Sequence, residues 1–216
     1  MLRVGLTGGV ASGKTTLAAL LGGLGAAVCD ADVVVEELYE PGRPGALVVQ
    51  ELFGPVALAG DRGVDRSALA RLVLTDPAAR RRLEEAVHPL VRKAVEGWFS
   101  ALAHASALPG VAVVEAALLV ETGAYRDQDR LVVVSAPYEV RRARALSAGW
   151  TANRFAQVVA AQLDDPTREA AADYVVHNEG GLDALEHAAR ELWPMLQEDA
   201  RLRAAGTPLP PRRTIF

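Results

Sequence analysis

The sequence contains a single cysteine, Cys29, among 216 residues, which excludes an internal disulfide. Because Cys29 closes an apolar run, we interpret it as a buried thiol rather than a reactive group or a metal ligand. Long hydrophobic runs are also missing. None approaches the roughly 18 residues that span a bilayer, and the N-terminus lacks the basic and hydrophobic segments of a signal peptide. These absences predict a cytoplasmic protein without a membrane partner.

Aromatic residues make up only 5% of the chain and are scattered along it, and the formal net charge is -4. Both features argue against nucleic acid as a partner. Lysine is scarce as well, because only Lys14 and Lys93 occur among the 23 basic residues and the other 21 are arginines. In such a chain, a lysine inside a glycine-rich loop indicates a site that needs a compact ammonium group.

That glycine-rich loop lies in the stretch VGLTGGVASGKTTLAALLGGLG, which begins at residue 4 and matches the pattern GxxxxGK[ST]. An apolar run precedes the loop and an alanine and leucine run follows it, so the order is strand, loop, helix, as the motif requires. Glycines allow successive backbone N–H groups to surround a phosphate, and the helix N-terminus adds partial positive charge. We predict that Lys14 bridges the β- and γ-phosphates of ATP and that the Thr15 hydroxyl binds Mg²⁺. The predicted ATP-binding residues here are Gly8, Gly9, Val10, Ala11, Ser12, Gly13, Lys14, Thr15 and Thr16.

Further short apolar runs at 26–30, 111–115, 131–135 and 174–177 are typical of strands covered on both faces. Helical patterns lie between them, which favours a doubly wound parallel sheet. Polar residues follow these runs at the carboxyl ends, where ligands gather in such sheets: Asp30, Asp32 and Glu115. The predicted fold class is α/β, a P-loop three-layer α/β/α parallel sheet that is nucleoside-monophosphate-kinase-like, with an inserted helical acceptor-binding subdomain and a lid.

Between residues 33 and 109 the pattern becomes helical, as an insertion between the second and third strands would require. The sequence carries neither the NKxD motif of a GTPase nor the LSGGQ motif of an ABC-type ATPase. A small-molecule kinase is therefore the leading class. A kinase of another small acceptor, such as a nucleoside monophosphate or a sugar, and an ATP-binding regulator that has lost phosphoryl transfer both stay open.

Beyond the phosphate loop, the chain resembles the dephospho-coenzyme A kinase family nearly end to end. The resemblance is carried by DAD at 30–32, EPGRPGAL at 40–47, LFG at 52–54, GVDRSAL at 63–69, VHPLV at 87–91, LLVE at 118–121, AAQ at 160–162 and ADYVVHNEG at 172–180. It implies transfer of the γ-phosphoryl group of ATP to the ribose 3′-hydroxyl of dephospho-CoA, which gives CoA and ADP in the final step of coenzyme A biosynthesis. It also implies a helical acceptor-binding domain and a mobile lid.

The resemblance assigns Asp32 as the catalytic carboxylate beside Lys14, because a carboxylate there can accept or orient the attacking hydroxyl. Asp30, Asp32, His88 and Glu115 are the predicted acceptor-binding residues, and Glu115 joins Thr15 in the predicted Mg²⁺ site. Ordinary structural roles remain alternatives, since Asp30 can cap a helix and His88 can simply pack or cap beside Pro89. Glu121 is weighed between a functional role and a structural one, in which it pairs with an arginine or caps a helix.

The segment 137–170 matches the family's lid, whose arginines would clamp the ATP phosphates. The family usually has an arginine just before the lid's turn, where this chain has Ser147, so the arginine that takes this role is left open. We predict Arg142 and Asn178 as ATP-binding residues, with Asn178 shaping the adenine pocket. The candidate lid arginines are Arg141, Arg142, Arg144, Arg154 and Arg168.

We expect one kinase domain over residues 1–200, followed by a tail. We expect the protein to be a monomer or a small homo-oligomer. The domain comprises a nucleotide core of residues 1–33, 109–136 and 171–200, a helical acceptor-binding insertion of residues 34–108, and a lid of residues 137–170. Residues 201–216 include GTPLPPRRTIF, whose three prolines predict a flexible C-terminal tail.

Overall fold

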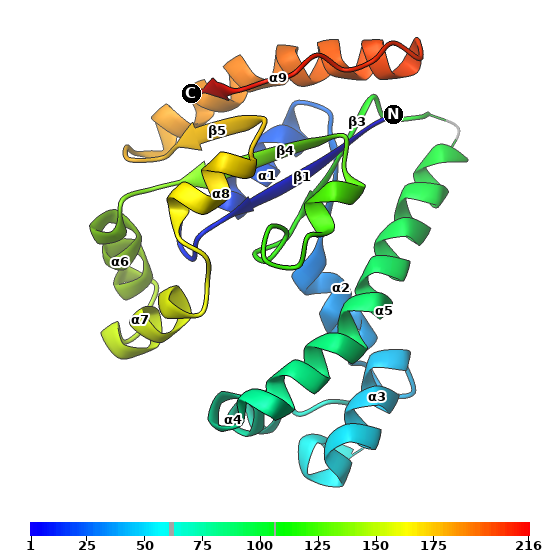
Figure 1. The fold of residues 1–216 in the computed structure, drawn as a ribbon, viewed down its shortest axis with the longest axis vertical. Coiled ribbons are helices and arrows are strands. Elements are labelled where there is room, and N and C mark those ends of the chain that lie inside the picture. The colour runs from blue at the N-terminus through cyan, green and yellow to red at the C-terminus, as the bar shows by residue number, and fades with distance from the viewer. Residues whose placement is uncertain (61–62, 106) are drawn as a thin grey trace. The chain divides into compact units, whose positions relative to one another are not determined.

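A computed structural model describes residues 1–60, 63–105 and 107–216 (Figure 1). The chain divides into two compact units. The first unit comprises Met1–Cys29 with Leu102–Phe216, and the second comprises Asp30–Ala101. The second unit corresponds to the predicted insertion of residues 34–108, with boundaries a few residues earlier at both ends. Residues 61–62 and 106 of that predicted range lie outside the described residues.

The first unit is built on a six-stranded sheet in the order β2-β3-β1-β4-β5-β6. β1 pairs in parallel with β3 and β4, and β5 pairs in parallel with β4 and β6. This arrangement confirms the predicted α/β class with a parallel sheet, and all the predicted strands are present. The strands are β1 (Leu2–Gly8), β2 (Ala27–Asp30), β3 (Val111–Glu115), β4 (Arg130–Ser135), β5 (Tyr174–His177) and β6 (Thr214–Ile215).

Side chains alternate between the two faces of this sheet, as the period of a strand requires. On one face, Val132 and Val134 of β4 share a core with α1 (Lys14–Gly23) and α9 (Leu182–Ala204), which contribute fully buried leucines such as Leu17 and Leu192. On the other face, Val133 packs in a separate cluster with Leu119 and Ala172. The sheet is therefore the middle of three layers. The other helices of this unit are η3 (Ala124–Asp127), α6 (Tyr138–Ser147), α7 (Ala152–Ala160) and α8 (Asp165–Ala171).

The second unit is helical, as the sequence pattern predicted. Aspartates cap its helices, because Asp30 accepts from the backbone N–H of Asp32 at 2.8 Å and Asp65 accepts from that of Ala68 at 2.9 Å. Its small core contains fully buried Val49. The helices of this unit are α2 (Ala31–Leu38), α3 (Pro44–Phe53), η1 (Gly54–Ala57), α4 (Arg66–Thr75) and α5 (Pro77–Ala103), whose last residues extend beyond Ala101.

The C-terminal residues differ from the flexible tail predicted for 201–216. α9 continues to Ala204, and β6 adds a short parallel strand to β5. The prediction of a flexible tail was based on its prolines, but side chains of the tail have partners in the rest of the first unit. Arg212 donates to Asp199 at 3.2 Å, and Phe216 packs against the same core as α1 and α9. The tail is therefore docked on the sheet.

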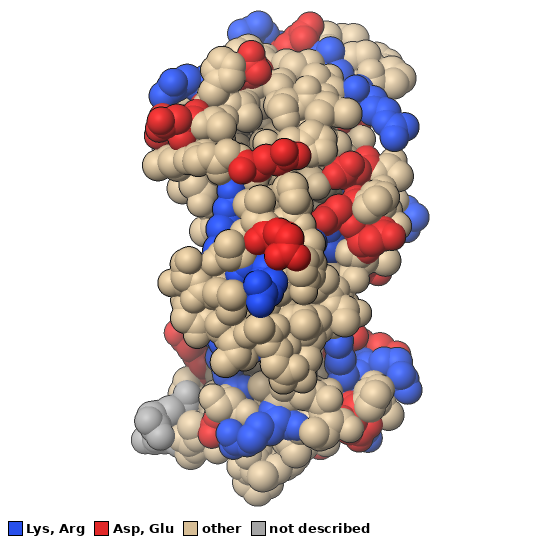
Figure 2. Space-filling model, turned by 90° about the vertical axis from the view of Figure 1, so that its left-hand side faces the viewer, with Lys and Arg blue, Asp and Glu red and all other residues tan. Residues whose placement is uncertain are grey.

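On the face shown in Figure 2, basic and acidic side chains of the described residues are interspersed rather than gathered by sign. Among the helices over residues 1–60, 63–105 and 107–216, none combines the length and the apolar character that a bilayer crossing needs.

Candidate active site

The phosphate loop runs from Gly8, at the end of β1, to Lys14, the first residue of α1. Its backbone enters the left-handed region at Ala11, with φ 58°, and at Gly13, with φ 103°. A non-glycine residue in this region carries strain, and such strain is typical of ligand-binding turns. At Gly13 a β-carbon would lie 2.3 Å from Nδ2 of Asn178, so glycine is required. The loop is a tight cradle whose helix N-terminus favours an anion.

At the second residue of this helix, the hydroxyl of Thr15 donates a hydrogen bond of 2.6 Å to Oε1 of Glu115. Glu115 is the last residue of β3, which is the neighbour of β1 in the sheet, and it is only 6% exposed. Burial of a carboxylate is costly unless it has partners, so this pair is a built feature of the site. The structure thus brings together the two residues predicted to hold Mg²⁺.

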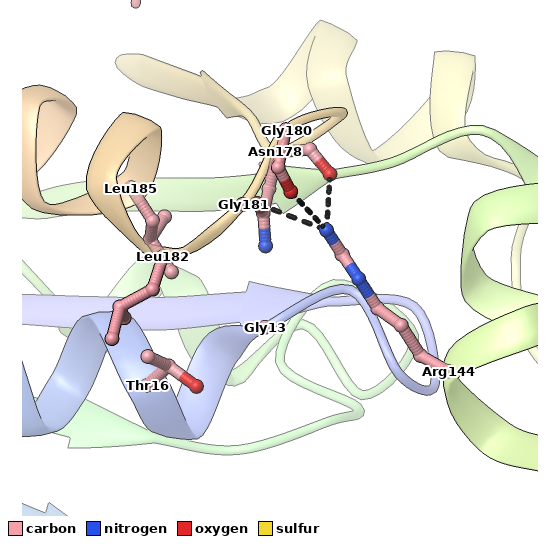
Figure 3. Close-up of a pocket in the computed structure, with 8 residues that line it drawn as sticks. All are labelled: Gly13, Thr16, Arg144, Asn178, Gly180, Gly181, Leu182 and Leu185. Carbon is pink, nitrogen blue, oxygen red and sulfur yellow. Dashed lines mark hydrogen bonds between the residues drawn. The ribbon is translucent and has the colours of Figure 1, made fainter. Parts of the chain in front are cut away.

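Asn178 closes over the other side of the loop. Its side-chain Nδ2 donates to the carbonyl of Ser12 at 2.7 Å, and its backbone N–H donates to the carbonyl of Ser135 at 2.7 Å. The guanidinium of Arg144, on α6, donates to Oδ1 of Asn178 at 3.2 Å and to the carbonyl of Gly180 at 2.9 Å (Figure 3). These contacts join the phosphate loop, the turn after β5 and the first helix of the predicted lid.

Arg144, Asn178 and Gly180 also line a cavity of about 220 Å³ between α1 and the start of α9 (Figure 3). Its walls combine leucine side chains, glycine backbone and one guanidinium. This is the combination expected for a planar heteroaromatic ring, because a guanidinium can stack on such a ring and apolar side chains exclude water from it. The lining residues are Gly13, Thr16, Arg144, Asn178, Gly180, Gly181, Leu182 and Leu185.

Two further arginines, Arg141 and Arg168, lie over the beginning of the loop. A β-carbon on Gly9 would lie 2.4 Å from Nη1 of Arg141 and 3.4 Å from Nη1 of Arg168. Both guanidinium groups are buried and share the carboxylate of Asp165, to which Nη2 of Arg141 donates at 3.0 Å. Nη1 of Arg141 is buried without a hydrogen-bond partner among the described residues. Such an orphaned donor beside a phosphate loop is placed to meet an anionic oxygen.

The segment between α7 and α8 also contacts the loop. Oε1 of Gln162 accepts the backbone N–H of Val10 at 2.9 Å. Nearby, Glu121 accepts the backbone N–H of Leu163 at 3.1 Å and lies 3.5 Å from Nε of Arg168. Glu121 therefore pairs with an arginine, which was one of the roles weighed for it.

A model of the dephospho-CoA kinase family matches residues 2–184, a stretch that contains the phosphate loop, Glu115, Asn178 and the arginines of α6 and α8. The chain belongs to this family. The dephospho-CoA kinase of Frankia casuarinae is 41% identical over 206 residues, which cover 94% of this chain and 88% of that relative. The dephospho-CoA kinase of Thiobacillus denitrificans is 43% identical over 187 residues, which cover 86% and 90%. The resemblance stated from the motifs is thereby confirmed.

Solved structures agree with the fold. A protein from Thermus thermophilus is 31% identical with a TM-score of 0.76, covering 90% of this chain and 97% of its own. The dephospho-CoA kinase from Campylobacter jejuni has a TM-score of 0.68 at 20% identity, covering 91% and 97%. A shikimate kinase from Acinetobacter baumannii has a TM-score of 0.52 at 15% identity, covering 92% and 94%. At such low identity the last two likenesses concern the fold alone, and they agree with the predicted three-layer α/β architecture.

The predicted site residues fall into both units. The whole phosphate loop, Glu115 and Asn178 lie together in the first unit. Asp30, Asp32 and His88 lie in the second unit. Asp30 caps α2 through the backbone N–H of Asp32, which is the structural role weighed for it, while His88 is exposed on α5.

Two contacts of the first unit were not predicted from the sequence. The arginine whose contacts reach the turn at Asn178 is Arg144, whereas the predicted residue, Arg142, is half-buried two positions earlier on α6. The stretch AAQ at 160–162 supported the resemblance without a role for Gln162, yet the side-chain Oε1 of this residue accepts a hydrogen bond from the backbone N–H of Val10 in the phosphate loop. The helical period could have separated the arginines, because Arg141 and Arg144 are three residues apart and share a face of α6.

Proposed function

We propose that this protein transfers the γ-phosphoryl group of ATP to the ribose 3′-hydroxyl of dephospho-CoA and releases CoA and ADP. The observation that carries the proposal is the phosphate loop with Thr15 bonded to the buried Glu115, in a chain that belongs to the dephospho-CoA kinase family. Phosphoryl transfer depends mainly on position and electrostatic stabilisation. The proposed roles below therefore concern charge and geometry.

In this proposal the nucleotide binds with its phosphates in the loop and its base in the cavity beside Gly13. The amide N–H groups from Gly8 to Thr16 surround the phosphates, and Lys14 supplies a mobile positive charge. Arg144 is held by Asn178 and Gly180, so its planar guanidinium is available in a fixed orientation for stacking on the base. Arg142, the arginine first predicted, is kept as a second candidate for the phosphates.

Arg141 and Arg168 are the proposed clamp on the transferred group. Their guanidinium groups are buried over Gly9, where they would stabilise the charge that develops during transfer. The shared Asp165 carboxylate fixes their orientation without neutralising both charges. The bond between Gln162 and Val10 would hold this part of the lid on the loop.

The first unit also fits Mg²⁺. Oxygen ligands suit this ion, and in kinases it is held by one or two protein groups and by the phosphates. Because Glu115 accepts the hydroxyl proton of Thr15, the lone pairs of that oxygen can face a cation. Within residues 1–60, 63–105 and 107–216, no group of three or more His, Cys, Asp or Glu side chains could hold a metal by itself, which suits a metal that arrives with ATP. When bound, Mg²⁺ would neutralise charge on the β- and γ-phosphates.

Asp32 is the proposed general base or orienting group for the 3′-hydroxyl, and Asp30, His88 and Glu115 are the proposed acceptor-binding residues. The support for these roles is the family resemblance of DAD at 30–32 and VHPLV at 87–91. A cytoplasmic location, a monomer or small homo-oligomer, and the absence of a nucleic-acid partner belong to the same proposal.

The deciding experiment measures ADP release by the purified protein with ATP and Mg²⁺. Dephospho-CoA is compared with AMP, CMP, adenosine, gluconate and no acceptor. We expect release only with dephospho-CoA, together with a product that has the mass of CoA. Turnover with another acceptor alone would move the protein to a different small-molecule kinase activity, and ATP binding without turnover would favour the regulator.

A further inference from the structure

The outer edge of β5 is covered by the C-terminal strap, which we define as residues 207–216. The strap continues the parallel sheet, and its backbone hydrogen bonds reach the last residue of β5. These bonds run from Thr214 N–H to Asp173 O at 3.1 Å, from Phe216 N–H to Val175 O at 2.9 Å and from His177 N–H to Phe216 O at 3.0 Å.

His177 directly precedes Asn178, so the final bond of the strap fixes the backbone at the start of the turn over the phosphate loop. The position of Asn178 is critical there. Its Nδ2 lies 2.7 Å from the carbonyl of Ser12. It also packs so closely on Gly13 that a β-carbon at this position would lie only 2.3 Å from it. A shift of this turn by even a fraction of an ångström would alter both the loop and the cavity that Asn178 lines.

The strap itself is anchored at two points. The side chain of Phe216 packs on the core, with its ring centroid 6.3 Å from that of Tyr174. Upstream, Nη2 of Arg130 donates to the carbonyl of Pro210 at 2.7 Å, and Arg212 donates to Asp199 at 3.2 Å.

The second anchor is a buried ionic network. Asp199 is fully buried and also accepts from Arg130 at 2.7 Å and from the hydroxyl of Tyr174 at 2.6 Å. Every polar group of such a network must keep its partner, since a buried charge without one is strongly destabilising. The network therefore holds the strap in a single register along β5.

From this geometry we infer that the C-terminal strap is a positioning element for ATP, which acts through Asn178 on the phosphate loop. The inference rests on the proposed ATP-binding function. It concerns residues beyond 184, where the match to the family ends. The strap itself touches no reacting atom in this proposal. It sets how well the turn at Asn178 is ordered before the nucleotide arrives, and thus how much ordering ATP binding must supply.

The test compares two neighbouring truncations in the full chain, Phe216→Ala and Ile215→Ala. Ile215 is 63% exposed, so its truncation is the matched control. We expect Phe216→Ala to raise the KM for ATP and the Kd for ATP measured without acceptor by about fivefold, while kcat stays within about twofold. Amide exchange at 174–178 should accelerate in the same variant. Equal effects of both truncations, or an accelerated exchange with unchanged ATP affinity, would overturn the inference.

A double-mutant cycle tests the route through Asn178. In an Asn178→Ala background, Phe216→Ala should no longer change the Kd for ATP, whereas an undiminished effect would show that the strap does not act through Asn178. If Phe216→Ala fails to fold, the same measurements are made on the milder variant Arg212→Ala, with Arg213→Ala as its control. Because the readout is ATP binding without acceptor, a wild-type protein that binds ATP but does not phosphorylate dephospho-CoA would refute the proposed function and leave this test intact.

Discussion

The hydroxyl of Thr15 and the carboxylate of Glu115 are joined by a 2.6 Å hydrogen bond across one hundred residues of sequence. Thr15 lies in the first turn of the helix after the phosphate loop, and Glu115 is the last residue of the neighbouring strand β3. The bond orients a hydroxyl oxygen toward the cradle, and it places a buried negative charge within reach of a cation that ATP would carry.

Glu115→Gln should therefore act through the metal. We expect the Mg²⁺ concentration for half-maximal rate to rise at least about tenfold, in line with the loss that removal of an outer-shell partner typically causes. The KM for ATP at saturating Mg²⁺ should change much less. The measurement is a Mg²⁺ titration of ADP release. Glu139→Gln, an exposed carboxylate on α6, is the control. An unchanged Mg²⁺ titration in Glu115→Gln would contradict the metal role.

The two lysines of the chain allow a matched test of the loop. Lys14→Ala should lower kcat by about 10²- to 10³-fold, because it removes a charge that stabilises the transferred phosphoryl group. Lys93→Ala, at an exposed position on α5, should leave kcat unchanged. The measurement is the kcat of each variant from steady-state kinetics at saturating ATP. Near-normal turnover in Lys14→Ala would remove this lysine from the mechanism.

Asp32→Asn tests the proposed base. The variant keeps the shape of the side chain but cannot accept the hydroxyl proton, so it should bind ATP and dephospho-CoA normally while kcat falls by about 10²-fold or more. Asp65→Asn retains a good helix cap on α4 and serves as the control. Equilibrium binding of both substrates is measured beside the rate. A parallel loss of binding and rate would point to a structural role for Asp32.

Two glycines allow a test of the close approach at Asn178. Gly13→Ala places a methyl group 2.3 Å from Nδ2 of Asn178 at a φ of 103°, so it should destabilise the fold by about 1–3 kcal/mol and weaken ATP binding. Gly97→Ala, within α5 and facing open space, should instead stabilise the fold by about 0.5–1 kcal/mol. Urea unfolding provides both values. If Gly13→Ala left the free energy of unfolding unchanged, the turn at Asn178 would be able to move away from the added methyl group at little cost.

The network around Asp199 predicts a pH dependence of stability. Burial alone would raise the pKa of Asp199, but hydrogen bonds from Arg130, Tyr174 and Arg212 outweigh it and lower the pKa below the ordinary value of 3.8. The folded state therefore binds this proton more weakly than the unfolded state. The resulting stabilisation is present above about pH 3.8 and is lost as the pH falls through the lower, folded-state pKa.

Asp199→Asn should accordingly cost up to about 3–5 kcal/mol at neutral pH, because it removes the buried carboxylate that pairs with Arg130 at 2.7 Å and leaves that arginine only Asp173, at 3.1 Å. The difference from wild type should shrink as the pH drops below 3.8. Asp183→Asn, exposed in the first turn of α9, should cost less than about 1 kcal/mol. Urea unfolding at several pH values measures these differences. A difference that stays constant into the acid range would exclude titration of Asp199 as its source.

The sequence was sufficient for the parts of the molecule that have a local signal. Apolar runs with β-branched residues marked β1 to β5, and the loop pattern marked the cradle and its Thr15. The partner Glu115 was found because parallel strands end at one edge of a sheet. These features depend on short-range pattern and on one general rule of topology.

Other features depend on contacts between residues that are far apart. The choice of Arg144 requires the angle at which α6 meets the turn at Asn178, and that angle has no local signal. β6 was not predicted because a strand of two residues in a proline-rich segment has no recognisable sequence pattern. The residues that anchor this segment, Arg130 and Asp199, are distant in sequence. Buried charge networks of this kind are decided by tertiary structure alone.

The two-residue length of β6 has a consequence for the protein in a crowded cell. Without the strap, β5 would present a row of unpaired backbone groups at the border of a hydrophobic parallel sheet, and such borders recruit strands from other chains. β6 pairs with that border and, because it is only two residues long, offers almost no border of its own, and prolines and two arginines precede it. Prolines and charges are the gatekeepers that oppose aggregation. The docked C-terminus therefore protects the sheet against edge-to-edge self-association.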